Sequence, residues 1–369
     1  MDFRTATLAE LKQSPTRPEE KRAVVGLDGF VDTIVTPVAL RTGQGDAFEP
    51  IPTIADFGQR ILGAAGKSTN LELYPRMDKL GGNGPIMAHA LFAHGVQMNY
   101  IGALGRHSIH PVFQQLATQG EVVSLTDPAT TIAVEFDDGK LMLGQMRSLD
   151  DVNYDRMLEK LGQIGLQKMF GEADLISLVN WTMIPAMTEI FRRLLADVFP
   201  TLPSKERRFF FDLADPEKRS RDDLLEVLNV IGEFERFGQV TLGLNLKEAQ
   251  QVHLGLGFFP LPEDEAGLRQ LASEIREKLN YSTVVLHPKE SAACATRKGT
   301  AWVPGPYVKK PLITTGAGDH FNAGFTMGQL IGLSPQGCLT TGVCTSGHYV
   351  RTGESPHRRD LETFLANWN

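Results

Sequence analysis

The chain has 369 residues, which is enough for one large domain or two of ordinary size and excludes a small disulfide-stapled module. Hydrophobic residues make up 42% and charged residues 22%, a balance typical of a globular protein with a sizeable core and not of a disordered one. The net charge of −7, carried without a block of basic residues, argues against a nucleic-acid partner.

The N-terminal residues 1–21 form a leader of unassigned purpose. Charged side chains are scattered through it, so it lacks the apolar core of a secretion signal. No stretch of the chain reaches the roughly 18 apolar residues of a membrane span. Cys294, Cys338 and Cys344 form no CxxC pair and predict buried thiols in a reducing compartment. We therefore expect a soluble, cytoplasmic protein without a membrane partner.

Short apolar runs that suit fully buried strands alternate with segments of helical periodicity. The predicted strands are Ala23–Leu27, Asn99–Ile101, Asp174–Val179, Arg208–Leu213, Gln239–Leu244 and Thr283–Leu286. The predicted helices are Pro85–His94, Pro111–Thr118, Pro185–Val198, Arg221–Phe234, Glu263–Leu279 and Phe321–Ile331. This alternation predicts a doubly wound α/β fold, in which helices flank a mostly parallel sheet.

Two stretches, at about residues 33–52 and 131–146, interrupt this alternation. The first is rich in Thr, Gly and Pro, and the second alternates strand-like segments around a turn at Asp137-Asp138-Gly139. Together they predict a small β-sheet added to the main domain. Because no repeat or linker divides the chain, we expect a single domain over residues 1–369.

Two carboxylates follow the first predicted strand, which ends in the loop Gly26-Leu27-Asp28-Gly29-Phe30-Val31-Asp32. Open α/β sheets bind ligands at the loops beyond the carboxyl ends of their strands, so Asp28 and Asp32 are candidate ligand contacts. Either carboxylate could instead only form the turn. The loop lacks the three-glycine fingerprint of a dinucleotide-binding dehydrogenase. Asp212 and Asn180 also end strands and are further candidates.

A glycine-rich turn precedes the first predicted helix. Gly81 and Gly82 would let the backbone approach a ligand closely, and the Asn83 side chain offers both a donor and an acceptor. The alternative is a plain turn before a helix that starts near Pro85.

Asn245 and Glu248 lie three residues apart at the start of a possible helix, and so on one face of it. Their oxygen atoms could organise hydrated Mg²⁺, which prefers hard ligands and retains waters. The alternative is a capping box, and both roles could hold together.

The sequence Thr314-Thr315-Gly316-Ala317-Gly318-Asp319 leads directly into an apolar helical segment. A glycine-rich turn at a helix N-terminus presents unpaired backbone N–H groups, which form an anion site. A carboxylate at the Asp319 position is stabilised by the helix dipole. The alternative is an aspartate cap with glycines that only permit a tight turn.

The longer pattern TTGAGDHFNAGF, residues 314–325, resembles the C-terminal signature of the ribokinase-like (PfkB) carbohydrate kinases. Residues 79–85, Lys-Leu-Gly-Gly-Asn-Gly-Pro, resemble the N-terminal signature of that family, and residues 245–249 are similar to its NxxE motif. The resemblance covers roughly residues 22–352. It implies a ribokinase-like fold and ATP-dependent phosphorylation of a hydroxyl of a sugar or sugar-like molecule, with Mg²⁺.

The resemblance also implies a role for each matching residue. Asp319 would be the general base, and the backbone N–H groups of Gly316, Ala317 and Gly318 would form the anion hole. The sugar would contact Asp32, or as second choice Asp28, together with Gly81, Gly82 and Asn83. The nucleotide would contact Thr315, Asn245 and Gly347, and Mg²⁺ would be held by Asn245 and Glu248 through water. Residues 33–52 and 131–146 would form a lid, through which two copies could pair as a homodimer.

Several family positions are altered. Ile313 replaces an acidic residue, which removes an expected polar contact near the phosphates or to an activating monovalent cation. Ile86 replaces an asparagine at the sugar end, and His287-Pro288 replaces a turn beside the nucleotide. Arg106 stands in place of an aspartate, where it could contact an acidic substrate or be an ordinary solvated arginine.

Two alternatives to a sugar kinase remain open on the sequence. A nucleoside kinase of the same fold would need aromatic stacking from lid residues such as Phe48 or Phe136. A non-catalytic regulator would bind sugar or nucleotide without turnover.

Overall fold

The computed structural model describes residues 2–368, and its strands form two sheets of unequal size. The large sheet has nine strands: β1 (Arg22–Leu27), β5 (Gln97–Ala103), β6 (Glu121–Thr126), β9 (Leu175–Leu178), β10 (Arg208–Asp212), β11 (Gln239–Leu244), β12 (Thr283–Leu286), β13 (Ser291–Thr296) and β14 (Gly299–Pro304). Their spatial order is β14-β13-β12-β11-β10-β9-β1-β5-β6. All neighbours pair in parallel except β13, which is antiparallel to both β12 and β14.

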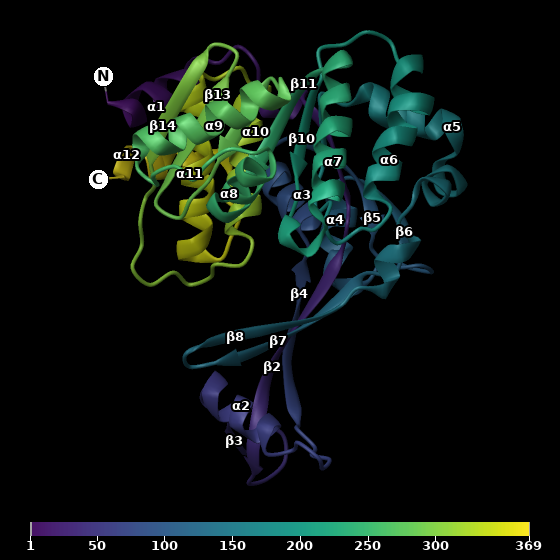
Figure 1. Cartoon of the computed structure of the whole chain (residues 1–369), viewed down its shortest axis with the longest axis vertical. Coiled ribbons are helices and arrows are strands. Elements are labelled where there is room, and N and C mark those ends of the chain that lie inside the picture. Colours follow the sequence, from purple (N-terminus) through teal and green to yellow (C-terminus); the bar gives the residue numbers. More distant parts are fainter. Residues whose placement is uncertain (1, 369) are drawn as a thin grey trace.

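Helices cover both faces of the large sheet (Figure 1). They are α1 (Phe3–Gln13), α3 (Asn83–Ala93), α4 (Gln114–Gln119), α5 (Tyr154–Glu172), α6 (Met187–Arg193), α7 (Arg221–Glu233), α8 (Leu246–Gly255), α9 (Glu265–Leu279), α10 (Ala317–Leu330), α11 (Pro335–Thr352) and α12 (Arg358–Asn367). One apolar core includes side chains of α5 to α9, and the other includes side chains of α1, α3, α4 and α10 to α12. The central strands are apolar on both sides because both cores need them. The predicted doubly wound α/β fold is confirmed.

Each predicted strand and helix has a counterpart in the structure, with small shifts at the ends. The difference that matters for the site is the start of α10, which lies at Ala317 and not at the predicted Phe321. Gly316 adopts a left-handed conformation (φ 87°) and turns the chain directly into the helix. Within residues 1–21, α1 packs against α11 and α12 and buries Leu11.

The small sheet projects from the main body, below it in Figure 1. Its strands are β2 (Phe30–Arg41), β3 (Phe48–Pro50), β4 (Leu73–Gly81), β7 (Ala129–Phe136) and β8 (Gly139–Gln145), with α2 (Ile54–Leu62) beside them. Residues 33–52 and 131–146 lie in this sheet, and β4 pairs with β2 to enlarge it. We call residues 30–81 and 129–145 together the lid.

Two sequence features can be checked directly. All three cysteines are buried thiols, as predicted. No helix within residues 2–368 has the length and apolar character that crossing a membrane requires.

Candidate active site

The start of α10 lies at the centre of the candidate site. The N–H of Ala317 donates to the carbonyl oxygen of Thr314 (3.2 Å) and closes the turn. Within residues 2–368, the N–H groups of Gly316 and Gly318 have no hydrogen-bond partner. A Cβ at Gly318 would lie 3.2 Å from the His287 ring. The turn therefore offers two free backbone donors at the positive end of a 14-residue helix, which suits an anion.

Asp319 lies in the first turn of α10 and is almost fully buried. Its Oδ1 accepts a hydrogen bond from the side-chain amide of Asn83 (2.9 Å). Burial raises the pKa of Asp319 to about 8, with smaller raising contributions from the charges of Asp28 and Glu248, while the Asn83 hydrogen bond lowers it. A carboxylate with this pKa is a strong base once it is deprotonated.

Asp28 lies beneath the site and is fully buried. Its carboxylate accepts the N–H groups of Asn83 and Gly84 (both 2.9 Å) and the amide of Asn180 (2.7 Å). Burial raises its pKa to about 6. These donors use the carboxylate to fix the start of α3, so Asp28 positions Asn83 and is not open to a sugar.

Asp32, by contrast, lines a cavity of about 760 Å³ between the lid and the loop of residues 311–315 that precedes α10. Burial raises its pKa, whereas a hydrogen bond with Thr131 and the charge of Lys140 lower it. A Cβ at Gly81 would lie 2.5 Å from Asp32 Oδ2, and one at Gly82 would lie 2.9 Å from Asp28 Oδ2. The two glycines thus make room for carboxylates, where we expected them to admit the sugar.

A second cavity, of about 440 Å³, lies between α11 and the loop before α10. Asn245, His287, Gly318 and Gly347 line it, and Thr314 and Pro311 line both cavities. The two cavities therefore meet at the loop that precedes α10, and transfer between two bound substrates requires such neighbouring sites.

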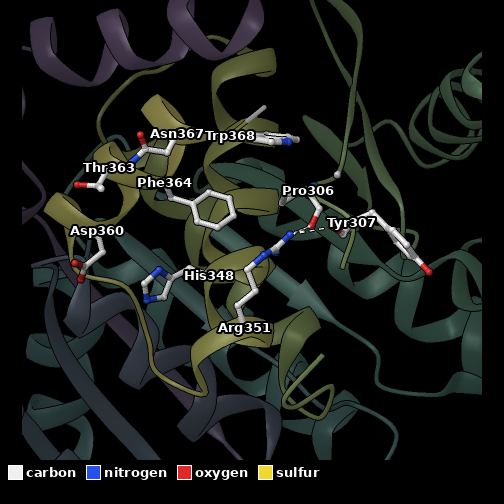
Figure 2. Close-up of a pocket in the computed structure, with 10 residues that line it drawn as sticks. Pro306, Tyr307, His348, Arg351, Asp360, Thr363, Phe364, Asn367 and Trp368 are labelled. Carbon is white, nitrogen blue, oxygen red and sulfur yellow. Dashed lines mark hydrogen bonds between the residues drawn. The ribbon is translucent and has the colours of Figure 1, made fainter. Parts of the chain in front are cut away.

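Gly347 and Arg351 shape the wall of the second cavity. A Cβ at Gly347 would lie 2.4 Å from the Pro306 ring, so the glycine lets the loop of residues 305–307 rest on α11. Arg351 donates to the carbonyl oxygens of Gly347 (2.7 Å), Pro306 (2.7 Å) and Tyr307 (3.0 Å) and braces this loop from behind (Figure 2). A neighbouring surface cavity of about 670 Å³ lies around Phe364 and shares this loop as part of its wall. Figure 2 shows the side chains that line it.

Thr315, which we predicted on the nucleotide side, lines the lid-side cavity instead. Its carbonyl oxygen accepts the hydroxyl of Tyr349 (2.9 Å), whose ring stacks on His320 at 3.6 Å. Ile313 and Ile86 line the same cavity, so the two altered family positions give it an apolar surface.

Asn245 and Glu248 form the capping box of α8. Asn245 Oδ1 accepts the N–H of Glu248 (3.0 Å), and Glu248 Oε2 accepts the N–H of Asn245 (2.9 Å). Glu248 Oε1 accepts the N–H of Asp215 (2.9 Å). Both Glu248 oxygens are therefore held by the backbone, and among residues 2–368 no three His, Cys, Asp or Glu side chains are grouped as a complete metal site.

Asp212, at the end of β10, has a carboxylate oxygen available for a cation, whereas both oxygens of Glu248 in the capping box are engaged by backbone N–H groups. Its Oδ2 accepts the Asn322 amide (3.0 Å), but its Oδ1 is buried without a partner in the described chain. Burial raises the Asp212 pKa well above its usual value, and the charges of Glu248 and Asp319 raise it further. A cation would relieve this cluster, so the residues present fit a Mg²⁺ that keeps most of its waters.

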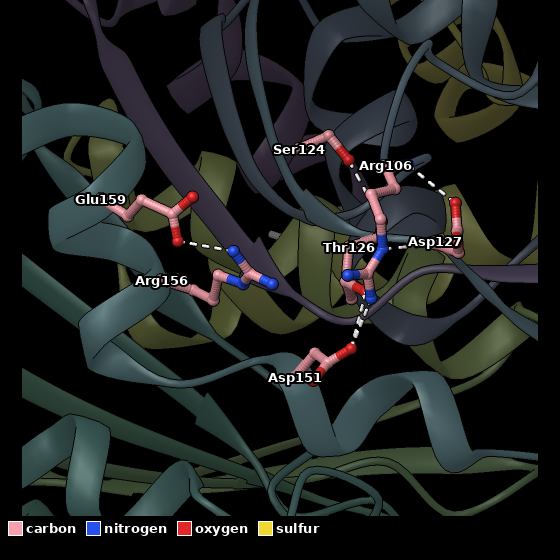
Figure 3. Close-up of polar contacts among 7 residues, drawn as sticks. All are labelled: Arg106, Ser124, Thr126, Asp127, Asp151, Arg156 and Glu159. Atoms are coloured by element: carbon pink, nitrogen blue, oxygen red, sulfur yellow. Dashed lines mark hydrogen bonds and ion pairs between the residues drawn. The ribbon is translucent and has the colours of Figure 1, made fainter.

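Arg106 does not line either cavity. Its Nη2 donates to Asp151 (2.5 Å) and Thr126 (3.1 Å), and its backbone N–H donates to Asp127 (2.7 Å) (Figure 3). Thr126 and Asp127 lie where the chain leaves β6 for β7, and Asp151 ends the helical turn that follows β8. Arg106 therefore braces the root of the lid and is not free for an acidic substrate.

His287 and the two lid phenylalanines each pack against a neighbouring aromatic ring. Burial lowers the pKa of His287 to about 4, so the ring is neutral and packs on Phe321 at 5.0 Å. Phe136 packs on Phe57 (5.4 Å), and Phe48 packs on Tyr74 (5.1 Å). Phe48 lines neither cavity, whereas Phe136 also lines the lid-side cavity.

Comparisons with known proteins agree with this site. A family model described as prokaryotic ketohexokinase matches residues 2–368. The chain belongs to the prokaryotic ketohexokinase family. It is 27% identical over 356 residues to a ketohexokinase of Haloferax volcanii, covering 96% of this chain and 93% of the relative. A member of this family is a carbohydrate kinase, as the sequence signatures predicted.

Solved structures confirm the ribokinase-like fold of this family member. A carbohydrate kinase from Agrobacterium tumefaciens aligns with a TM-score of 0.64 and 15% identity, over 94% of this chain and 97% of that one. Arabidopsis thaliana ribokinase complexed with ribose and ATP aligns with a TM-score of 0.62 and 16% identity, over 94% and 98%.

Proposed function

We propose that the chain transfers the γ-phosphoryl group of ATP to a hydroxyl of a ketohexose. The observation that carries this proposal is Asp319, a buried carboxylate with a raised pKa in the first turn of α10, next to Gly318, which lines the cavity along α11. The name of the Haloferax volcanii relative supports a ketohexose as the acceptor. Phe48 packs on Tyr74 and lines neither cavity, so the first of the two aromatic residues considered for a nucleoside does not face the acceptor.

In the proposed reaction the sugar lies in the lid-side cavity, with hydroxyls on Asp32, and ATP lies in the cavity along α11. Asp319 accepts the proton of the attacking hydroxyl while Asn83 holds the carboxylate in place. The hydroxyl oxygen bonds to the γ-phosphorus, and the bond to the bridging oxygen breaks, so ADP leaves with the electron pair. The free N–H groups of Gly316 and Gly318 stabilise the charge on the transferring group.

Mg²⁺ on the ATP phosphates supplies further charge neutralisation when it is bound. Asp212, with Asn245 and Glu248 through water, would hold it. The unpartnered Asp212 Oδ1 is the atom best suited to a direct contact.

We further propose that two copies pair through their lids. Leu40, Met77, Met142 and Leu143 lie on the lid and are 44–57% exposed. In the described chain β8 pairs with β7 alone, which leaves an open edge.

A coupled assay of ADP release tests the proposed function. Purified protein with MgATP is offered ketohexoses, aldohexoses, pentoses, sugar acids and nucleosides at equal concentration. We expect ketohexoses to give the highest kcat/KM, with a phosphorylated sugar detected by ³¹P NMR. A higher kcat/KM on a nucleoside, or sugar binding by calorimetry without any ADP release, would contradict the proposal.

A further inference from the structure

The candidate site is rich in carboxylates and poor in positive charge. Asp28, Asp212, Glu248 and Asp319 surround the start of α10, and burial raises the pKa of each of them. In the proposed reaction the triphosphate of ATP binds near these carboxylates, so the negative charges of the two groups repel each other. In the described chain, the Lys and Arg side chains that line the two cavities are Lys79 and Lys140 on the lid side and Lys289 on the nucleotide side.

Lys140 is the one of these that reaches the start of α10. It lies at the beginning of β8, and its Nζ donates a hydrogen bond to the hydroxyl of Thr315, the residue before Gly316. Its charge also lowers the pKa of Asp32. The ammonium group therefore lies between the Asp32 carboxylate, which we propose contacts the sugar, and the proposed anion hole.

The other two lysines have different surroundings. Lys79 lies opposite Asp32 in the β2–β4 pair and is exposed to solvent. Lys289 lies at the far wall of the nucleotide cavity, with its Nζ 5.8 Å from the centre of the Tyr307 ring. Neither makes a hydrogen bond to the turn at residues 314–316 in the described chain.

The body of the lid holds Lys140 in place. The N–H of Asp137 donates to the carbonyl oxygen of Pro52 (2.8 Å), and Asp138 Oδ1 accepts the N–H of Ile54 at the start of α2 (2.9 Å). These two bonds fix the turn that precedes Lys140. The ammonium group therefore moves with the lid as a whole, and Arg106 braces the root of that lid.

We propose that Lys140 is a catalytic residue, which the lid places against the transferring phosphoryl group. This inference rests on the proposed kinase function. As the sugar oxygen bonds to the γ-phosphorus and the bond to ADP breaks, the proton goes to Asp319 and Lys140 keeps its own proton throughout. Its ammonium exchanges the Thr315 hydroxyl for a γ-phosphoryl oxygen and stabilises the charge that develops there. The γ-phosphoryl group is then transferred fastest when the lid has closed over a sugar.

Steady-state kinetics of Lys140→Met test this role, with Lys298→Met as the matched control. Lys298 lies in the exposed turn between β13 and β14, away from both cavities. We expect Lys140→Met to lower kcat by about 10²–10³-fold while the sugar KM changes little, as for the loss of one transition-state donor. Lys140→Arg should recover part of that loss, and Lys298→Met should match wild type.

Chemical restoration separates a charge effect from a folding effect. Lys140→Cys is treated with 2-bromoethylamine, which rebuilds a lysine-like ammonium on the exposed position, while the three native cysteines are buried. We expect the treated protein to regain at least tenfold in kcat. A kcat for Lys140→Met within threefold of wild type, or no recovery after alkylation, would overturn the role of Lys140. If the wild type phosphorylates no sugar at all, the proposed function itself fails.

Discussion

The side-chain amide of Asn83 donates a hydrogen bond to the Asp319 carboxylate over 2.9 Å and joins the starts of α3 and α10 across 236 positions of sequence. The backbone N–H of the same Asn83 is held by Asp28 at the end of β1. The two signature motifs of the chain are therefore one unit in space. Asp28 fixes Asn83, and Asn83 fixes the carboxylate that we propose as the base.

Removing the Asn83 amide should weaken the proposed base. The wild-type kcat/KM should rise with pH up to about pH 8, because Asp319 accepts a proton only when it is deprotonated and its pKa is about 8. In Asn83→Ala the rise of kcat/KM should occur at higher pH, because the hydrogen bond that lowers the Asp319 pKa is lost. We expect kcat at pH 7.5 to fall about 10–100-fold.

Asn153→Ala is the matched control for that pH profile. Asn153 caps α5 by accepting the N–H of Arg156 (3.0 Å), far from the site. Its loss should cost about 1 kcal/mol of stability and leave the pH profile unchanged. An Asn83→Ala profile that overlays that of wild type would contradict the role of the amide.

Gly316→Ala should damage activity more than stability. The residue has φ 87°, and a Cβ there would lie 3.2 Å from the Ile86 side chain, so the turn that presents the free N–H groups would shift. We compare it with Gly332→Ala, where φ is 77° and the Cβ meets no atom within 4 Å. Both should lose about 1–2 kcal/mol in urea unfolding from left-handed strain, but only Gly316→Ala should lose more than tenfold in kcat. Equal kcat values for the two variants would contradict the anion hole.

Asp319→Asn should stabilise the fold in a pH-dependent way. The Asp319 pKa is about 8 in the folded protein and near 3.8 ordinarily, so folding takes up a proton between these values and the stability of wild type falls as pH rises through that window. The variant lacks this effect. Thermal unfolding should therefore give nearly equal Tm values at pH 4 and a Tm higher by a few degrees for the variant at pH 8. A variant with a lower Tm than wild type at pH 8 would mean that burying the ionised Asp319 carboxylate does not destabilise the folded protein.

Leu143→Glu should disrupt the proposed lid-to-lid pairing. Leu143 is 47% exposed on the edge strand β8, where a charge would oppose an apolar contact. Sedimentation velocity at micromolar concentration should show a dimer for wild type and a monomer for the variant. Leu254→Glu, at a 51% exposed position on α8, should remain dimeric. A monomeric wild type would rule the pairing out.

The sequence predicted the fold class and the strand and helix order, because buried strands and amphipathic helices leave strong periodic signals. The sequence also singled out Gly316 and Asp319 as candidate site residues, because a glycine turn and an aspartate at a helix start point to an anion site. The exact start of α10 was missed because a left-handed glycine adds a turn that apolar periodicity does not show.

Other site features depend on tertiary contacts that no local pattern reveals. Asp28 and Asp32 look alike in the sequence, and only the donors from α3 show that Asp28 is already engaged. Lys140 matches no motif, because its position depends on how the lid folds over α10. Thr315 faces the lid for the same reason.

The most direct test of the account is the turnover of Asp319→Asn on the best ketohexose, with saturating MgATP at pH 8.5. The variant keeps the shape of the side chain and loses the base. We predict that kcat falls by at least 10³-fold while calorimetry finds sugar and ATP binding within about threefold of wild type. A kcat within tenfold of wild type would contradict the assignment of Asp319 as the general base.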